Sequence, residues 1–105
     1  MRVIVVGTAE YDIAGAVADA GYELVRVDIG NLDGLQAATI EEADVYVLTE
    51  IAQATSIAVA KEQNDGLKIV VYADGSLPDF ARGQADLILD PALFDPADVA
   101  AELDA

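Results

Sequence analysis

The chain has 105 residues, 54% of them hydrophobic, and its 20 acidic and five basic residues give a formal net charge of −15. The hydrophobic fraction excludes a disordered chain, and the charge argues against binding nucleic acid, which requires lysine and arginine to neutralise phosphates. The absence of cysteine and histidine excludes disulfides, thiol catalysis and the commonest general base. No apolar run reaches the roughly 18 residues that cross a bilayer, so we expect a cytoplasmic protein without membrane insertion.

The acidic excess also bears on the conditions that favour folding. Repulsion among carboxylates destabilises a compact chain, and salt at about 1 M screens it because the Debye length falls to about 3 Å. The composition is therefore typical of a halophile protein, and we expect stability to fall at low salt. An acidic interaction module is the alternative interpretation.

Apolar strands and helical segments alternate along the first half of the chain. Strands are predicted at Arg2–Val6, Glu23–Val27 and Asp44–Thr49. A helix begins after Asp12, whose carboxylate is predicted to cap it, and continues to about Ala20. A weaker helix is predicted over Asn31–Ala38, with an extension to Glu42.

The same alternation continues in the second half. The best helix is predicted over Glu50–Gln63, and one short helical turn over Pro78–Gly83. Asp95 is predicted to cap the last helix, with Pro96 at its first position. Strands are predicted at Leu67–Tyr72 and Asp86–Leu89.

Strands that alternate with helices through short loops indicate right-handed crossovers and a parallel sheet. We therefore expect one domain over residues 1–105, with a three-layer α/β fold of the Rossmann-like or flavodoxin-like type and five parallel strands in the order 2-1-3-4-5. Ligands of such sheets lie beyond the carboxyl ends of the strands, where the strand order reverses. Here that point lies between the first and third strands, beside Gly7 and Thr49.

The loop after the first strand has part of a dinucleotide-binding pattern. That pattern, Gly-x-Gly-x-x-Gly, lets the backbone approach a pyrophosphate. Gly7 matches its first glycine, whereas Ala9 and Asp12 stand at the second and third. Asp28 follows Gly7 by 21 positions, the spacing expected of a ribose-binding carboxylate. The alternative is that Asp12 is a helix cap and Asp28 simply ends a strand.

Several later segments carry a resemblance to a known family. They are Ile40–Asp44, Thr49-Glu50, Ala58–Glu62, Leu67–Ala73 and Gln84–Pro91. In these segments the chain resembles the TrkA-N (RCK) domain, a regulatory domain of potassium-uptake systems and potassium channels. With the opening strand, Gly7 and Asp28, the similarity covers most of the chain.

The resemblance implies a function and a set of site residues. In that family the domain binds NAD(H) or an adenine nucleotide, pairs with a second copy and gates a transporter. The resemblance places Gly7 and Ala9 at the phosphates, with Thr8 between them in the cofactor-binding loop. It places Asp28 at the ribose and Thr49 near the nicotinamide. It thus implies a non-enzymatic regulatory domain that binds NAD or an adenine nucleotide weakly and forms a homodimer or binds a protein partner.

Two alternatives retain the fold without this ligand. One is a stand-alone protein-interaction domain that has lost ligand binding. The other is a receiver domain, whose phosphotransfer needs an acidic pair after the first strand, an aspartate ending the third and a lysine after the fifth. Glu10 and Asp12 imitate the pair, but the third strand ends in Thr49-Glu50 and the fifth in Asp90-Pro91. Phosphotransfer is therefore not expected, and an inactive, receiver-like interaction domain stays open as an alternative.

Two further sets of side chains give weaker signals. A cation site is conceivable from the carboxylates of Glu10, Asp28, Glu50 and Asp74, although none of them has the spacing of a metal-binding loop. The second set either forms an exposed apolar patch for self-association or closes the core. Its members are Leu77, Phe80, Leu93 and Phe94.

Overall fold

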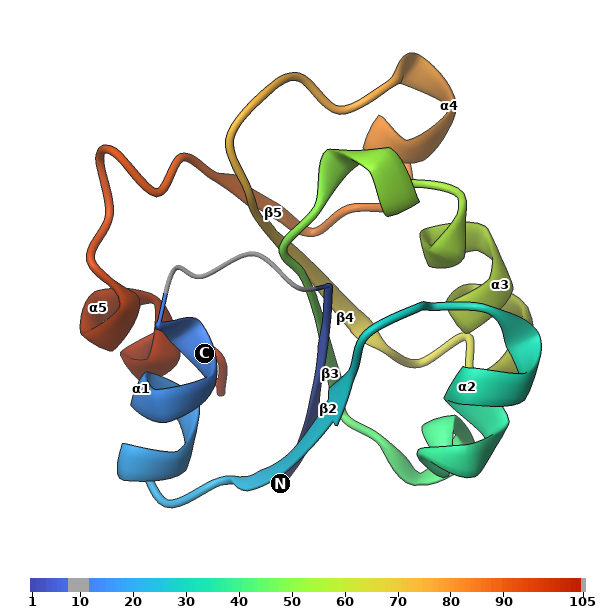
Figure 1. The fold of residues 1–105 in the computed structure, drawn as a ribbon, viewed down its shortest axis with the longest axis horizontal. Coiled ribbons are helices and arrows are strands. Elements are labelled where there is room, and N and C mark those ends of the chain that lie inside the picture. The colour runs from blue at the N-terminus through green and yellow to red at the C-terminus, as the bar shows by residue number, and fades with distance from the viewer. Residues whose placement is uncertain (8–11, 105) are drawn as a thin grey trace.

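The computed structural model describes residues 1–7 and 12–104. Their five parallel strands form one sheet in the order β2-β1-β3-β4-β5, between two layers of helices (Figure 1). The predicted three-layer α/β fold, of the flavodoxin-like type, and its strand order are therefore confirmed. The strands are β1 (Arg2–Val6), β2 (Glu23–Val27), β3 (Val45–Leu48), β4 (Lys68–Tyr72) and β5 (Leu87–Leu89).

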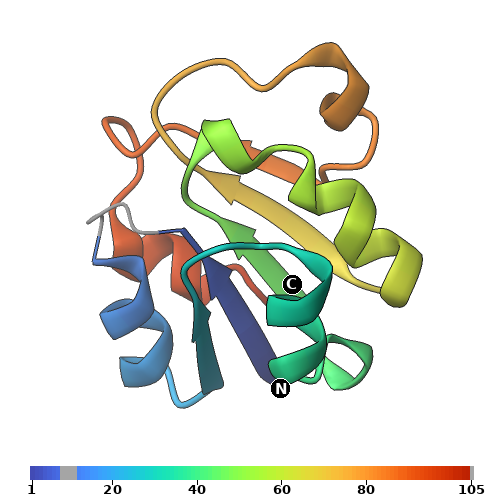
Figure 2. The same cartoon turned by 45° about the vertical axis from the view of Figure 1, so that its right-hand side comes forward.

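The helices divide between the two faces of the sheet. One face is covered by α1 (Ile13–Asp19) and α5 (Pro96–Ala101). The other is covered by α2 (Leu32–Ala37), α3 (Ser56–Gln63) and α4 (Asp79–Arg82), as the turned view in Figure 2 also shows. Two 3-10 turns, η1 (Ile40–Glu42) and η2 (Ile51–Gln53), precede β3 and α3.

Side-chain alternation along the central strands builds two cores. Because neighbouring residues of a strand point to opposite faces, Val3 and Val5 pack in the cluster under α1 and α5. Ile4 and Val6 pack in the larger cluster under α2 and α3. All four side chains are buried, which explains why β1 is apolar at nearly every position.

The helix predicted over Glu50–Gln63 begins later than the sequence indicated, so the prediction is wrong for its first residues. The backbone instead forms the 3-10 turn η2, in which the Gln53 N–H donates to the Glu50 carbonyl at 3.0 Å. The α-helix α3 begins only at Ser56. This tighter turn leaves the Gln53 side chain in contact with the segment that follows β2. Local periodicity does not report such a tertiary contact.

The side-chain caps predicted at two aspartates are absent. Asp12 stands before α1 but has left-handed backbone angles (φ 60°, ψ 20°), and its carboxylate makes no capping hydrogen bond. Asp95 precedes α5, again without a side-chain cap. The capping side chain that the structure does show belongs to Asn31, whose Oδ1 accepts a 2.8 Å hydrogen bond from the Gly34 N–H at the start of α2.

A membrane span requires a helix of sufficient length and apolar character. None of the helices within residues 1–7 and 12–104 has both.

Candidate functional site

The carboxyl ends of β2, β1 and β3 meet at the point where the strand order reverses. The Gly7 N–H donates to the Val27 carbonyl, and the Thr49 N–H donates to the Val6 carbonyl, both at 2.9 Å. The predicted site residues Gly7, Asp28 and Thr49 are thus brought to the same edge of the sheet. The predicted site residues Thr8 and Ala9 lie outside the described part of the chain.

The space above Gly7 is occupied by side chains that follow β3. Gly7 has a φ of +118°, and a Cβ built on it would lie 2.3 Å from Thr49 Oγ1 and 3.1 Å from Glu50 Oε1. The bare glycine backbone therefore makes room for Thr49 and for a carboxylate. A carboxylate at this position would repel the phosphates for which the glycine was predicted.

Thr49 is part of the core and not of an open crevice. Its side chain is only 2% exposed, and its hydroxyl donates a 2.8 Å hydrogen bond to the Val6 carbonyl oxygen. This bond fastens the end of β3 to the end of β1. The hydroxyl's proton is therefore already used in a contact within the protein.

The segment after β2 is held by Gln53, a residue that the sequence did not single out. The Gln53 Nε2 donates to the Asp28 carbonyl at 2.8 Å, and its Oε1 accepts from the Gly30 N–H at 2.7 Å. The Nε2 also donates to Glu50 Oε1 at 3.3 Å. Asp28 itself is exposed to solvent. A glutamine inside a predicted helix gives no signal of such a role, because Asp28 and Gly30 lie in the segment after β2, far from Gln53 in the sequence.

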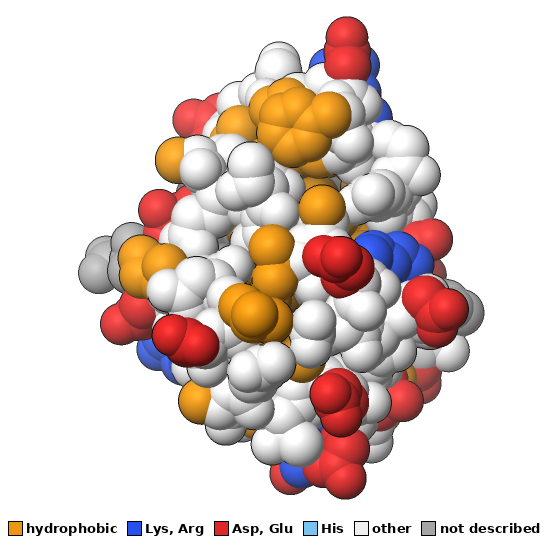
Figure 3. Space-filling model, turned by 90° about the vertical axis from the view of Figure 1, so that its right-hand side faces the viewer, with side chains coloured by type: hydrophobic (Ala, Val, Ile, Leu, Met, Phe, Trp, Pro, Cys, Tyr) orange, Lys and Arg blue, Asp and Glu red, His pale blue; other side chains and the backbone are white. Residues whose placement is uncertain are grey.

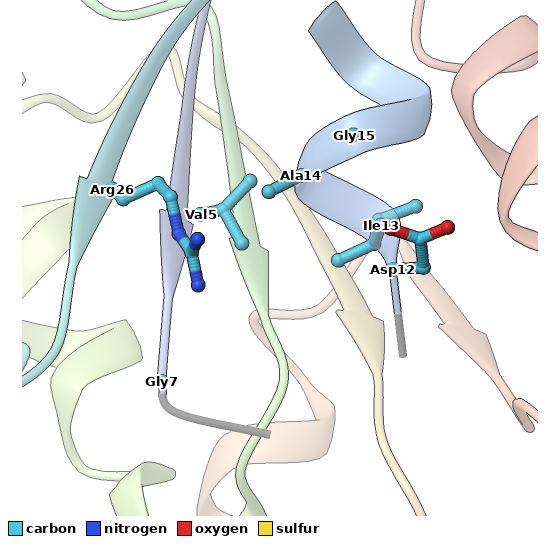
Figure 4. Close-up of a pocket in the computed structure, with 7 residues that line it drawn as sticks. All are labelled: Val5, Gly7, Asp12, Ile13, Ala14, Gly15 and Arg26. Atoms are coloured by element: carbon cyan, nitrogen blue, oxygen red, sulfur yellow. The ribbon is translucent and has the colours of Figure 1, made fainter. Parts of the chain in front are cut away.

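A pocket of about 340 Å³ lies beside this edge, between β1, β2 and the start of α1. Figure 4 shows Arg26 and Asp12 on opposite walls, with Val5 and Ile13 between them. Within the described ranges, Arg26 is the only basic residue that lines this pocket. One guanidinium opposite one carboxylate is a sparse set of groups for binding a diphosphate.

Other basic side chains are engaged elsewhere. The Lys61 Nζ donates to the Leu67 carbonyl at 3.0 Å, and the Lys68 Nζ donates to the Glu102 carbonyl at 3.1 Å. The Arg2 guanidinium donates to the Glu23 carboxylate at 3.2 Å. These contacts hold the fold together at sites away from the β1–β3 edge.

The acidic residues of this edge do not form a metal site in the described ranges. Residues 1–7 and 12–104 contain no group of three or more carboxylates arranged to hold a metal ion. The Glu10 of the suggested cation site lies outside those ranges, and the other three members are described. The structure therefore gives the cation hypothesis no geometric support.

A second feature is the apolar surface around β5. Phe80 is 62% exposed, Leu93 76% and Phe94 43%, whereas Leu77 is 3% exposed and belongs to the core. Ile88, in the middle of β5, is 50% exposed and was not predicted to be. We call the exposed residues Phe80, Ile88, Leu93 and Phe94 the β5 surface. The face that carries α2, α3 and α4 also shows hydrophobic side chains at its upper end, with acidic groups around them (Figure 3).

The fold has several close counterparts among solved structures. An orphan response regulator of H. pylori has a TM-score of 0.76 and 16% sequence identity, with 99% of this chain and 93% of that one covered. An atypical orphan response regulator, described as having a phosphorylation-independent regulatory mechanism, has a TM-score of 0.74 and 17% identity, covering 99% and 92%. A putative pilus assembly-related protein from Burkholderia pseudomallei has a TM-score of 0.71 and 16% identity, covering 99% and 87%.

These comparisons correct the family expected from the sequence. The matching structures are response regulators and a pilus-related protein, so the resemblance to the TrkA-N domain is wrong. The apolar strands and acidic loops that carried it are shared by many parallel α/β sheets. The nucleotide binding that the resemblance implied loses its support. The cofactor roles of Gly7, Thr8, Ala9, Asp28 and Thr49 stay predictions of the sequence.

Sequence comparison settles the family. No curated protein matches the sequence. A family model described as a family of unknown function (DUF7126) matches residues 3–103, and the chain therefore belongs to that family.

Proposed function

We propose that this chain is a non-enzymatic, receiver-like domain that acts by binding a protein partner and does not accept a phosphoryl group. The observation that carries the proposal is Thr49, which follows β3 where a phosphoacceptor domain needs an aspartate. Its hydroxyl is buried and donates to the Val6 carbonyl. The chain has no histidine, and the hydroxyl proton is donated to a backbone carbonyl, which is not a general base that could activate a nucleophile.

The end of β5 supports the same proposal. A receiver domain places a lysine there to stabilise the charge on the phosphoryl group, and this chain has Asp90. The Asp90 Oδ1 accepts a 2.8 Å hydrogen bond from the Ala92 N–H, so this carboxylate closes a local turn. A negative group at this position disfavours a phosphorylated state, because like charges repel.

Two further observations favour protein binding as the activity. The β5 surface carries four of the seven large apolar side chains that are exposed in the described ranges, and exposed apolar surface marks interaction sites. A protein of the same fold is described as regulating without phosphorylation. Such a mechanism suits a chain that has the fold and lacks the phosphoacceptor.

The first experiment tests phosphorylation directly. The purified protein is incubated with acetyl phosphate and Mg²⁺ and its intact mass is measured, beside a phosphorylatable receiver domain treated in the same way. We expect the control to gain one phosphoryl group and this protein to keep its mass. A gain of one phosphoryl group on this chain would overturn the proposal.

The second experiment tests partner binding in the native host. A photo-crosslinking amino acid is placed at Phe80 or Leu93, and at the exposed positions Asp33 or Glu41 as matched controls. We expect irradiation to crosslink one and the same host protein to the Phe80 and Leu93 variants, and not to crosslink it to the Asp33 and Glu41 variants. If all four positions give the same result, the claim that this domain acts through a protein partner fails.

A further inference from the structure

No strand within the described residues 1–7 and 12–104 pairs with the outer edge of β5. In the sheet β5 pairs with β4, and β4 lies between β5 and β3. The Lys68 N–H of β4 donates to the Asp44 carbonyl before β3 at 3.1 Å, so by alternation the backbone groups of Ile69 and Val71 face β5. Because Val70 lies opposite Leu87, these groups pair with Leu87 and Leu89. The N–H and C=O groups of Ile88 therefore point away from β4 and leave a donor and an acceptor at the edge of the sheet.

An apolar groove runs beside this edge. Leu87 and Leu89 lie opposite Val70 and Tyr72 of β4, on the face that α5 covers. Together with Phe94 and residues of α5 they line a groove of about 420 Å³. The Tyr72 hydroxyl fixes one end of the groove by donating a 2.6 Å hydrogen bond to the Phe94 carbonyl. The groove can therefore receive the side chains of a strand added beside β5.

The opposite face of β5 is also apolar and exposed. Ile88 lies opposite Val71 of β4, on the face that packs in the larger core with α4. Its side chain is half exposed, and Phe80 of α4 is 62% exposed. Successive side chains of an added strand would point alternately to the groove and to this face, so one row would meet the groove and the other row would meet Ile88.

The charges around β5 identify the chemistry of the occupant. Asp98 and Glu102 line the groove, and Asp86 and Asp90 flank the strand. The nearby Lys68 ammonium is engaged by the Glu102 carbonyl at 3.1 Å. An antiparallel second copy centred on Ile88 would set Asp86 of one chain against Asp90 of the other. Like charges facing each other in this way disfavour a homodimer and favour a basic partner.

We propose that the edge of β5 binds an extended segment of a partner protein, in which lysine or arginine alternates with apolar residues, by strand addition. This inference rests on the proposed function, because it names the partner chemistry of that interaction domain. Backbone hydrogen bonds to Ile88 supply register. The basic side chains lie along the groove, where Asp98 and Glu102 select them, and the apolar side chains pack on the opposite face beside Ile88.

The test uses two synthetic hexapeptides, one alternating lysine with valine and one alternating glutamate with valine. Each is titrated into isotope-labelled protein at physiological ionic strength, and the backbone amide signals are followed. We expect saturable shifts at residues 86–90 with the lysine peptide, and affinity lower by about ten-fold or more with the glutamate peptide. Equal shifts at residues 86–90 with both peptides would show that the carboxylates do not select a basic partner, and would overturn that part of the proposal.

Matched variants separate this site from the general attraction of a basic peptide to an acidic protein. Asp98→Asn with Glu102→Gln removes two charges from the groove, whereas Glu41→Gln with Glu62→Gln removes two exposed charges elsewhere. We expect the first pair to weaken binding by about three-fold or more and the second pair to change it much less. Equal losses would show non-specific attraction and overturn the proposal.

A second pair of variants tests the backbone pairing. Ile88→Pro removes an N–H that faces away from β4, so the ladder with β4 is retained. Ile88→Val keeps that N–H while shortening the side chain. We expect the proline variant to lose peptide binding and the valine variant to keep most of it, with both amide spectra still those of a folded protein. If the proline variant is unfolded, an N-methylated lysine peptide replaces it and is expected to bind no more than the glutamate peptide.

The remaining outcomes distinguish the occupants and the two proposals. Shifts at 86–90 that depend on protein concentration without any peptide would identify a second copy as the occupant and overturn the basic partner. Flat titrations of a chain that acetyl phosphate does not modify would overturn strand addition alone. A phosphorylated chain would instead overturn the proposed function, whatever the peptides do.

Discussion

Gln53 joins the turn after β3 to the segment after β2 through the Gly30 N–H, which donates a 2.7 Å hydrogen bond to its Oε1. Gly30 has no room for a side chain, because a Cβ there would lie 2.8 Å from Ser56 Cβ and 2.9 Å from the Tyr46 hydroxyl. The backbone of this segment is thus pressed onto the core and held by a glutamine. At the edge of the sheet where related folds bind a nucleotide, the segment after β2 instead packs against Gln53, Ser56 and Tyr46.

The first prediction concerns this contact. Gln53→Ala removes the bonds to Gly30 and to the Asp28 carbonyl, and we expect a loss of about 1–3 kcal/mol in the free energy of unfolding. Urea denaturation measures it. Gln36→Ala is the control, since the Gln36 side chain makes one surface contact of 3.5 Å with Gln63. Equal stability of the two variants would show that the Gln53 bonds contribute nothing.

The second prediction concerns Gly7. Gly7→Ala places a Cβ 2.3 Å from Thr49 Oγ1 at a φ of +118°, so both packing and backbone are strained. We expect a loss of about 2 kcal/mol or more in thermal or urea unfolding. Gly83→Ala is the matched control, because nothing lies within 4 Å of its Cβ position. A Gly7→Ala variant as stable as the control would contradict the close packing of Thr49.

The third prediction concerns Tyr46. Burial raises the pKa of Tyr46 to about 12, and its hydrogen bond to Ser56, at 2.6 Å, opposes part of that rise. A raised pKa means that the folded state keeps a proton that the unfolded state loses above pH 10. The stabilising effect is therefore complete below pH 10 and is lost as the pH rises toward about 12. We expect unfolding free energies of Tyr46→Phe to decline less over this window than those of the natural chain, and parallel curves would contradict it.

The fourth prediction concerns salt. With a net charge of −15, repulsion among surface carboxylates opposes folding, and added KCl screens it. We expect the melting temperature to rise steadily from low ionic strength to molar KCl. The double variant Glu41→Gln with Glu62→Gln, which removes two exposed charges, is expected to show a smaller rise. A melting temperature that does not change with KCl would contradict the electrostatic explanation.

The fifth prediction concerns nucleotides. The Glu50 carboxylate stands over Gly7, and Arg26 and Asp12 face the neighbouring pocket from opposite walls. We therefore expect titrations with NADH, NAD, ATP and AMP in molar KCl to be flat up to millimolar ligand. Saturable amide shifts at Gly7 and Asp28 would contradict this expectation and restore the cofactor roles predicted from the sequence.

The fold could be read from the sequence because it depends on repeated local patterns. Apolar β-branched runs predict buried strands, and their alternation with helices through short loops restricts the order to 2-1-3-4-5. The bounds of β1 and β2 agree with the prediction to the residue. The family did not follow, because the same patterns serve unrelated proteins with parallel sheets.

Tertiary structure decided what occupies the end of the sheet. The sequence alone determined the charge, the missing histidine and cysteine and the placing of Gly7, Asp28 and Thr49 at one edge. It gave no sign that Thr49 donates to Val6, that Gln53 holds Gly30, or that Ile88 is exposed beside a groove. Each of these depends on contacts between residues far apart in the chain. Secondary structure depends mainly on residues that are neighbours in the sequence. Whether the crevice at the end of the sheet is open or filled depends on side chains that meet only in the folded protein.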